Sequence, residues 1–374
     1  MLCKNVKLGG NLRHGLLRFV SLHKRLVIST NLIMINRRTF IRQSGALVAA
    51  SAFPYLAKAS QQEFTMTVTG PINPDQMKFT LSHEHVLVDF IGAEKVNKNR
   101  YNFDEAFKTA LPFLEDVSTK GCHTFVDCTP PYIGRDVDLL KKLAVETGMY
   151  ILTPTGYYGA AKEKYVPQHA YEETAEQLAN RWIDEWKNGI EGTGIKPGFI
   201  KCGVDKAPLS DVQRKLIDAA ALTHLATGLT IGVHTGDGPA AEAELQILAT
   251  RKVSPRARIW IHAQNEKDHS FHIRAAQRGS WVSFDGIGKE NIDENVKSFL
   301  VMKKEGLLDF VLASQDSGWY NVGDPGGGKF NDYNDIFTHF IPALKGAGFT
   351  NEEINRIFIT NPAKAFSIRI RKLI

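Results

Sequence analysis

A regular alternation that begins near residue 78 is the feature of this chain that most constrains its fold. Eight short runs of β-branched and apolar residues are each followed by a longer stretch with helical periodicity. The expected strands cover residues 79–87, 124–128, 150–154, 198–202, 230–233, 258–261, 280–284 and 309–312. Eight strands, each followed by a helix, predict an α/β fold of the (β/α)8 barrel type.

A doubly wound open sheet is the competing fold. Such a sheet normally has a glycine-rich turn after its first strand, and the segment LSHEHVLVDF has none. One expected helix has clear end signals, with Ser210 as its N-cap and Gly228 as its C-terminal stop. Because no repeat or Pro/Ser-rich linker interrupts the region, we expect residues 60–374 to form a single barrel domain.

The first sixty residues differ from the rest in charge. They contain ten Lys or Arg residues and no Asp or Glu, whereas residues 61–374 contain 36 basic and 40 acidic residues, a net charge of −4. The net charge of +6 for the whole chain therefore comes from the leader. Because the body is slightly acidic, nucleic acid is not an expected partner.

The leader, residues 1–59, resembles a twin-arginine export signal. It contains paired Arg37 and Arg38, a run of small and apolar residues over 45–53, and Ala57-Lys58-Ala59 before Ser60. Met34 is the alternative start, and the apolar run is too short to span a bilayer. We expect export through the twin-arginine machinery of a bacterium to the periplasm or beyond. No stable membrane insertion is expected after the signal is removed.

The cysteines do not form a disulfide or zinc pattern. Loss of the leader removes Cys3 and leaves Cys122, Cys128 and Cys202, an odd number without a CxxC pair. Since all three lie in apolar stretches, we expect buried, unpaired thiols.

Two histidines stand two residues apart in the first expected strand, FTLSHEHVLVDF. Side chains alternate along a strand, so His83 and His85 face one side and Glu84 faces the other. Taken alone, this pair fits a satisfied pair of core imidazoles as well as it fits a metal site.

The other strands also end in ionisable residues. Residues of this kind at or just after strand ends are His83, His85, Asp127, Lys201, His234, His262 and Asp316. Barrel chemistry is assembled at the carboxyl ends of the strands, so these side chains should converge. Nitrogen and oxygen ligands without thiolates suit zinc, manganese, cobalt or iron, and the number of candidates indicates two metal ions. Lys201 would be repelled by two dications unless it lost its proton or changed chemically.

Residues 79–366 resemble the phosphotriesterase family of the amidohydrolase superfamily. The matching motifs are TLSHEHV, VDCTPPYIGRD, GIEGTGIKPGFIKCGV, IGVHTGDG, RIWIHAQNEKD, VLASQDSGW and ITNPAKAF. The resemblance implies that His83, His85 and Asp316 hold one metal ion and that His234 and His262 hold the other. It also implies that Lys201 is carbamylated and bridges the two ions, which are expected to be zinc, with manganese, cobalt or iron as alternatives.

The implied activity is that of a binuclear metal-dependent hydrolase. A hydroxide shared by the two ions would attack a small phosphotriester, lactone or carboxylic ester, and Asp316 would accept the proton. Tyr157, Tyr158 and Trp319 are the candidate walls of the substrate pocket. Asp127 and Arg135 have two readings, direct chemistry or a supporting structural role, and we favour the second.

Two features leave the substrate open. Lactonase-type members tend to have Arg after the Asp of the seventh strand, where this chain has Gly286. The sixth-strand motif of the family usually reads GH, whereas here Ile261 precedes His262. The same centre could also support an amidase. The alternative outside enzymology is an exported metal-binding or carrier protein on the same barrel, without turnover. The resemblance is compatible with a homodimer, and the sequence itself shows no interface.

Overall fold

A ring of parallel strands forms the centre of the protein, which we describe from a computed structural model covering residues 63–373. The strands of the ring are β3 (Thr80–Val88), β4 (Thr124–Asp127), β5 (Tyr150–Leu152) with its continuation β6 (Pro154–Thr155), β7 (Phe199–Val204), β8 (Ile231–Thr235), β9 (Arg258–Ile261), β10 (Trp281–Phe284) and β11 (Val311–Ala313). They pair in the orders β11-β10-β9-β8-β7-β6 and β12-β3-β4-β5, where β12 is Gly318–Asn321. Ser82 Oγ donates to Ala313 O at 3.2 Å, which links β3 to β11 and closes the ring.

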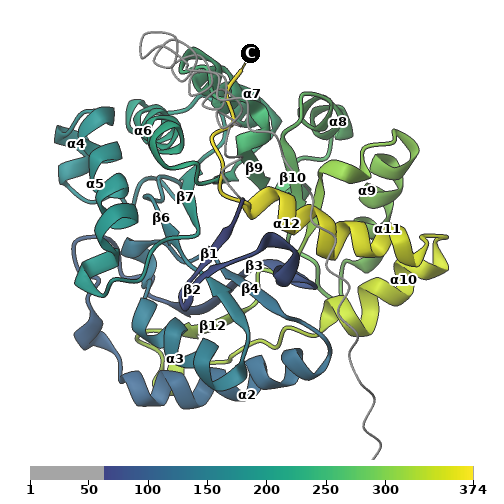
Figure 1. The fold of residues 1–374 in the computed structure, drawn as a ribbon, viewed down its shortest axis with the longest axis horizontal. Coiled ribbons are helices and arrows are strands. Elements are labelled where there is room, and N and C mark those ends of the chain that lie inside the picture. Colours follow the sequence, from purple (N-terminus) through teal and green to yellow (C-terminus); the bar gives the residue numbers. More distant parts are fainter. Residues whose placement is uncertain (1–62, 374) are drawn as a thin grey trace, which may run out of the picture. The chain divides into compact units, whose positions relative to one another are not determined.

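Helices surround this ring on its outer side (Figure 1). They are α2 (Phe103–Thr119), α3 (Val137–Thr147), α4 (His169–Glu172), α5 (Ala175–Asn188), α6 (Asp211–Thr227), α7 (Gly238–Thr250), α8 (His269–Gln277), α9 (Ile292–Lys304), α10 (Ile341–Gly346), α11 (Asn351–Asn355) and α12 (Asn361–Phe366). The predicted (β/α)8 barrel is therefore confirmed, and the described residues belong to one compact unit.

The ends of α6 agree with the sequence signals. Ser210 accepts from Gln213 N in a capping box, and Gly228 ends the helix with a left-handed φ of 79°. The strand bounds agree to within two residues at every end. The last strand begins two residues later than predicted, because Leu308–Phe310 form a 3₁₀ turn and the strand begins only at Val311.

Alternation along the strands decides which side chains enter the barrel. On β7, Ile200, Cys202 and Val204 pack against the helices, whereas Phe199 belongs to the cluster inside the barrel. Lys201 therefore shares the inward face with Phe199. On β8 the outward residues are Ile231 and Val233, so His234 also faces inward.

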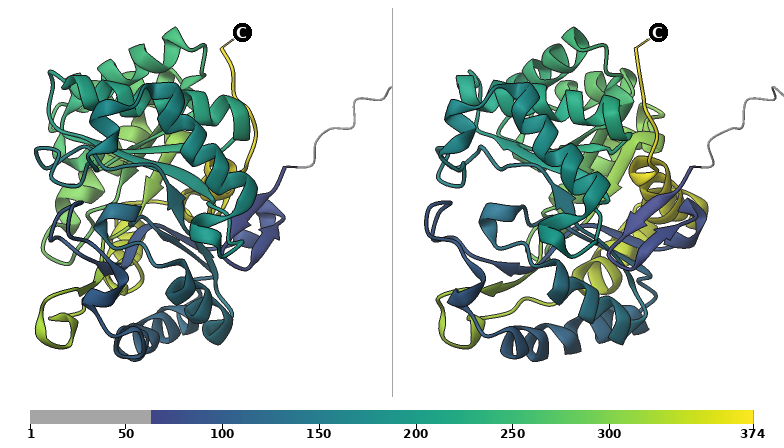
Figure 2. Two further views of the ribbon diagram at one scale, coloured as in Figure 1. Left: turned by 90° about the vertical axis from the view of Figure 1, so that its left-hand side faces the viewer. Right: turned by 60° about the vertical axis from the view of Figure 1, so that its left-hand side comes forward.

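A short hairpin packs beside the C-terminal segment. It consists of β1 (Thr65–Thr67) and β2 (Gly70–Ile72), and Phe64 just before it bridges to Ile368. Figure 2 shows the hairpin, in purple, next to the yellow α12. This packing ties the first described residues to the end of the chain.

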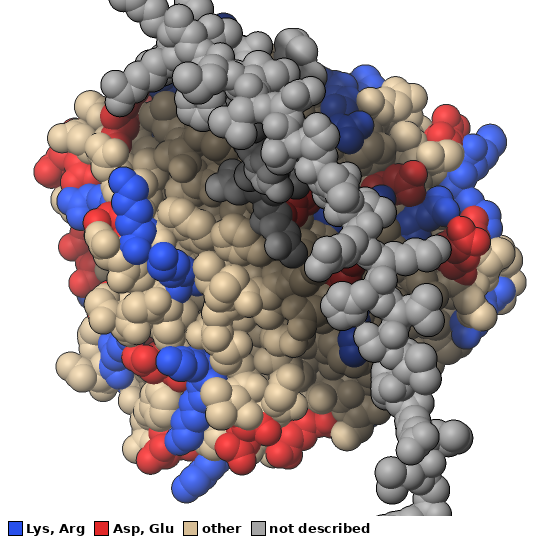
Figure 3. Space-filling view, viewed as in Figure 1, with Lys and Arg blue, Asp and Glu red and all other residues tan. Residues whose placement is uncertain are grey.

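The leader predictions concern residues outside the described range. The twin-arginine pair, the cleavage site, the start at Met34 and Cys3 all fall among residues 1–62. The prediction for the other cysteines is confirmed, since Cys122, Cys128 and Cys202 are free and buried. Among the described helices, none is long and apolar enough to cross a membrane. On the face in Figure 3, basic and acidic side chains are interspersed around the rim.

Candidate metal centre

Two strand ends bring three ligand atoms to one point. The Nε2 atoms of His83 and His85 lie 3.3 Å apart, and Asp316 Oδ1 lies 3.4 and 3.1 Å from them. The distances from Asp316 Oδ1 to the two histidine nitrogens are short, but the geometry is not that of a hydrogen bond. Asp316 Oδ1 is therefore buried without a hydrogen-bond donor among the described residues. Lone pairs that face one another in this way suit a cation between them.

A second group of potential ligands consists of the Asp285 carboxylate and the Nδ1 atoms of His83 and His262. Asp285 Oδ1 lies 2.6 Å from His262 Nδ1, and Asp285 Oδ2 lies 3.4 Å from His83 Nδ1. A carboxylate at Nδ1 orients the ring and leaves Nε2 free for a metal ion. Asp285 is absent from the predicted site residues. Its position directly after the seventh strand was a signal for it.

His234 and Lys201 complete the predicted set. The ring of His234 lies 4.5 Å from that of His262, and its Nδ1 atom is 3.0 Å from Tyr158 Oη. Lys201 is only 2% exposed, and its Nζ atom lies 5.9 Å from the centre of the Tyr158 ring. Its side chain forms no hydrogen bond or ion pair with any residue that the structure describes. A buried ammonium without a counter-ion is unfavourable, so this position suits a modified or metal-bound lysine.

All six predicted ligands line one cavity of about 200 Å³. Tyr158 and Trp319, two of the predicted walls, also line it, together with apolar residues such as Phe90 and Ile133. Asp127 is not on the wall: its carboxylate accepts from Val86 N at 2.8 Å and from Thr129 N at 3.0 Å. These bonds support the structural interpretation of Asp127.

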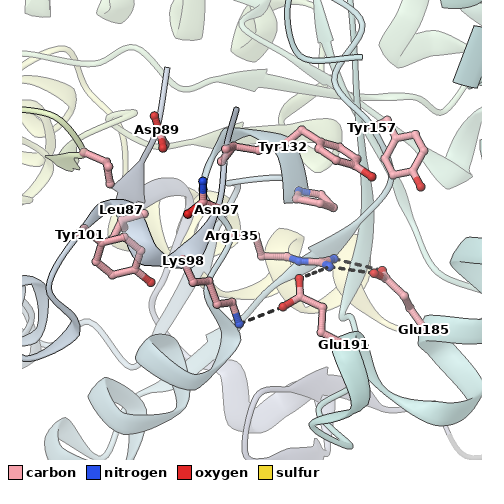
Figure 4. A pocket seen from close by; sticks show the side chains of 14 residues that line it. Leu87, Asp89, Asn97, Lys98, Tyr101, Tyr132, Arg135, Tyr157, Glu185 and Glu191 are labelled. Atoms are coloured by element: carbon pink, nitrogen blue, oxygen red, sulfur yellow. Dashed lines mark hydrogen bonds and ion pairs between the residues drawn. The ribbon is translucent and has the colours of Figure 1, made fainter. Parts of the chain in front are cut away.

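The structure does not place Tyr157 with the other two predicted walls. Tyr157 lines a separate cavity of about 340 Å³ (Figure 4). The side chains of these two neighbouring residues face opposite ways, so Tyr158 contacts the predicted metal ligand His234 and Tyr157 does not. The second cavity also contains Arg135, which pairs with Glu185 at 2.8 Å and with Glu191 at 3.3 Å. The structural interpretation thus holds for Arg135 as well.

Left-handed backbone conformations orient two of the predicted ligands, His262 and Asp316. On β9, Ile259 and Ile261 face the barrel interior, so simple alternation would turn His262 outward. A left-handed conformation, with φ of 60°, turns His262 toward the cavity instead. Asp316 and Trp319 also have positive φ values, of 55° and 80°. Such residues cost of order 1–3 kcal/mol each and cluster at functional sites.

Burial and neighbouring charges prepare most of these groups for a metal ion. Burial lowers the pKa of His85 to about 4, and burial together with His262 holds the pKa of His234 well below its usual value. Burial alone would raise the pKa of Asp316, but His83 and His85 hold it well below its usual range. Neutral imidazoles and ionised carboxylates are the forms that bind metals.

His83 is the exception among the ligands. Burial lowers the pKa of its imidazole, but the nearby Cys128, Asp285 and Asp316 raise it well above the usual value. The raised pKa favours the positively charged form of this imidazole, which lies between the carboxylates of Asp285 and Asp316. A divalent ion would take over this positive charge and displace the proton.

The space at Gly286, where lactonase-type members tend to have Arg, is filled by another side chain. A Cβ atom on Gly286 would lie 2.5 Å from Gln264 Nε2. Gln264 donates to Asp285 Oδ1 at 3.2 Å and accepts from Asp285 N at 3.2 Å. The absence of a side chain at position 286 therefore leaves room for the Gln264 amide that supports Asp285.

Replacing Asp285 with Asn is expected to weaken metal binding about 10–100-fold, because an amide supports the two imidazoles less well than a carboxylate does. Isothermal titration of the metal-free protein with zinc measures the change. Gln264→Ala, which removes one support of Asp285, is expected to have a smaller effect in the same direction. Unchanged zinc affinity in Asp285→Asn would show that Asp285 does not orient the ligands.

Known proteins match most of this chain along nearly their own full length. An aryldialkylphosphatase of Saccharolobus solfataricus is 28% identical over 310 residues, which are 79% of this chain and 97% of that protein. An N-acetyltaurine hydrolase of Salmo salar is 26% identical over 340 residues, covering 80% and 96% of the two chains. The crystal structure of a variant PTE-like lactonase of Deinococcus radiodurans has a TM-score of 0.72 and 26% identity, and the match covers 81% of this chain and 99% of that one.

The family model agrees with these relatives. The model described as the phosphotriesterase family matches residues 63–366, nearly all of the described chain. The motifs around His83, Lys201, His234 and Asp316 lie within this range. The chain therefore belongs to the phosphotriesterase family.

Proposed function

We propose that this protein is a binuclear metal-dependent hydrolase that cleaves a phosphotriester, lactone or carboxylic ester. The observation that carries the proposal is the convergence of four histidines, Lys201 and Asp316 on one cavity at the carboxyl ends of the strands. The relatives named above, a phosphatase, a lactonase and an amide hydrolase by name, support hydrolysis and differ in substrate.

The residues present fit two divalent ions. His83, His85 and Asp316 would hold one, His234 and His262 would hold the other, and a carbamate on Lys201 would bridge them. Among the described residues, Asp316 Oδ1 meets no donor and the buried Lys201 side chain has no hydrogen bond or ion pair, which supports this assignment. Zinc suits such nitrogen and oxygen ligands best, and manganese, cobalt or iron would be accommodated. When bound, the ions supply a water with a pKa near 7 and polarise the substrate oxygen.

The protein's own groups prepare the reaction. Asp285 orients the His262 ring through a hydrogen bond at Nδ1 and lies 3.4 Å from His83 Nδ1. Tyr158 Oη lies within hydrogen-bonding distance of His234 Nδ1. The apolar walls around Phe90 and Trp319 exclude bulk water, which strengthens electrostatic interactions inside the cavity. The ionised carboxylate of Asp316 is placed to accept a proton.

Initial rates on a matched substrate panel test the proposal. The full-length protein, loaded with zinc or manganese, is assayed on an aryl phosphotriester, several lactones, an aryl carboxylic ester and an N-acyl amide. We expect turnover of at least one of the esters that stops when a chelator removes the metal. The fastest substrate then identifies the specificity.

Two other outcomes would change the proposal. Turnover of the amide alone would move the activity to the amidase class. Two bound metal ions without any turnover would favour the metal-binding or carrier protein instead. The proposed site of action, the periplasm or the exterior, rests on the leader sequence and is tested by locating the protein in fractionated bacterial cells.

A further inference from the structure

We propose that Glu84 is a positioning residue that holds the loop carrying Asp316, so that the Asp316 carboxylate meets His83 and His85. The inference rests on the proposed metal site. Glu84 lies between the two histidines on β3 and is fully buried. Its side chain belongs to the opposite face of the strand and does not line the metal cavity.

Three hydrogen bonds join the Glu84 carboxylate to one segment after β11. Glu84 Oε1 accepts from Ser314 Oγ at 2.6 Å and from Gln315 N at 3.0 Å. Glu84 Oε2 accepts from Ser317 N at 2.7 Å. These donors stand on both sides of Asp316, so the carboxylate spans the residue that carries the metal ligand.

The backbone of Asp316 needs such a support. Asp316 has a φ of 55°, in the left-handed region that a residue with a side chain rarely adopts. Such a conformation persists only where its surroundings hold it in place. Hydrogen bonds from Asp316 N to His83 O, at 3.1 Å, and from His85 N to Ser317 O, at 3.0 Å, fix where the segment lies against β3. The Glu84 carboxylate adds the bonds to the N–H groups of Gln315 and Ser317 that fix its turn.

The same segment also forms a hydrogen bond with the backbone of His83. Ser314 Oγ donates to Glu84 and accepts from His83 N at 3.0 Å. One hydroxyl group therefore connects the carboxylate, the strand with the histidines and the loop with the aspartate. A change at Glu84 should therefore disturb both the strand that carries His83 and His85 and the loop that carries Asp316, which are the ligands of one proposed ion. His234 and His262, the ligands of the other, lie on other strands and should be unaffected.

Glu84→Gln is the main test, because it keeps the shape of the side chain and replaces one acceptor oxygen by an NH₂ group. That group cannot accept from Ser317 N or from Ser314 Oγ, and it leaves a buried donor facing another donor. We expect one of the two bound zinc ions to be held about 10–100-fold more weakly, and the other to be held as in the unchanged protein. Competition of the full-length holoprotein with a chelator of known affinity measures both constants.

Two further variants complete the test. Ser314→Ala removes one of the three donors to Glu84 and also the acceptor of His83 N, so it should weaken the same ion, and it carries the test if Glu84→Gln fails to fold. Asn361→Ala is the matched structural control. Its buried amide donates to Leu308 O at 2.7 Å and to Val311 O at 2.8 Å, at the opposite end of β11. We expect it to lower the melting temperature and leave both zinc affinities unchanged.

Zinc affinities equal to those of the unchanged protein in both Glu84→Gln and Ser314→Ala would overturn the inference. So would an Asn361→Ala protein that loses zinc as readily as Glu84→Gln at a similar melting temperature, since the effect would then be general destabilisation. Failure of the proposed function is distinguishable, because it appears as absent turnover in the unchanged protein while its two zinc affinities remain measurable.

Discussion

Replacing Lys201 with Met is expected to lower metal-dependent hydrolysis by at least about 1,000-fold, because the metals' supply of a nucleophile near neutral pH would be lost. Met fills a similar volume without an amine, so it removes the group that carbon dioxide would modify and keeps the packing of this 2% exposed position. We expect at most one tightly bound zinc ion per chain in the variant. Initial rates and zinc content by atomic absorption measure the two effects.

Direct detection of the carbamate separates a bridging lysine from a merely buried one. Reconstitution of the metal-free protein with zinc and ¹³C-labelled bicarbonate should give a carbamate signal by nuclear magnetic resonance, and Lys201→Met should lack it. Lys164→Ala, at an exposed position on a neighbouring loop, should keep the signal and the full rate. Normal turnover in Lys201→Met would show that the reaction does not depend on this lysine.

The barrel and most of its ligands follow from rules that act along the chain. The period of two places Lys201 and His234 on inward faces once their outward neighbours are seen to be apolar. The same rule shows that Tyr157 and Tyr158 cannot both face one cavity, so the sequence contained the signal against one of them. The strand count then brings the carboxyl ends together.

The parts that the sequence did not reveal depend on contacts between distant residues. His262 faces the cavity only through its left-handed conformation, which no local pattern predicts because the residue is not glycine. Asp285 supports its histidines across 23 and 202 positions of sequence, and the Glu84 carboxylate contacts a segment 230 to 233 positions away. Hydrogen bonds of this kind become visible only when the barrel has closed.

A buried ion pair between α7 and the outer faces of β8 and β9 is expected to have the largest effect on stability. Arg258 and Glu244 are both fully buried, and Arg258 Nε donates to Glu244 Oε2 at 2.7 Å. Thr235 Oγ1 donates to Glu244 Oε1 at 2.8 Å, and Arg258 Nη1 donates to Ser280 Oγ at 3.2 Å. The pair therefore connects α7 with β8, β9 and the start of β10.

Glu244→Ala is expected to lower the free energy of unfolding by about 3–5 kcal/mol, because it leaves the Arg258 guanidinium buried without a counter-ion. Arg cannot escape by losing its proton in the pH range of a folded protein. Urea unfolding of the metal-free protein, followed by circular dichroism, measures the loss without a contribution from metal binding. A decrease in the free energy of unfolding below about 1 kcal/mol would mean that water reaches the Arg258 guanidinium and that the pair is solvated.

The double variant Glu244→Leu with Arg258→Met separates two contributions to stability. One is the destabilisation caused by an unpaired buried charge, and the other is the net stabilisation by the ion pair itself. Two buried charges are desolvated in the native protein, so replacing both by apolar side chains of similar size is often neutral or stabilising. We expect the double variant to unfold within about 1 kcal/mol of the unchanged protein, well above Glu244→Ala. Because Thr235 directly follows His234, zinc affinity is measured on the same samples. Restored stability with weakened zinc binding would mean that this pair contributes to placing His234, whereas restoration of both would limit its role to the fold.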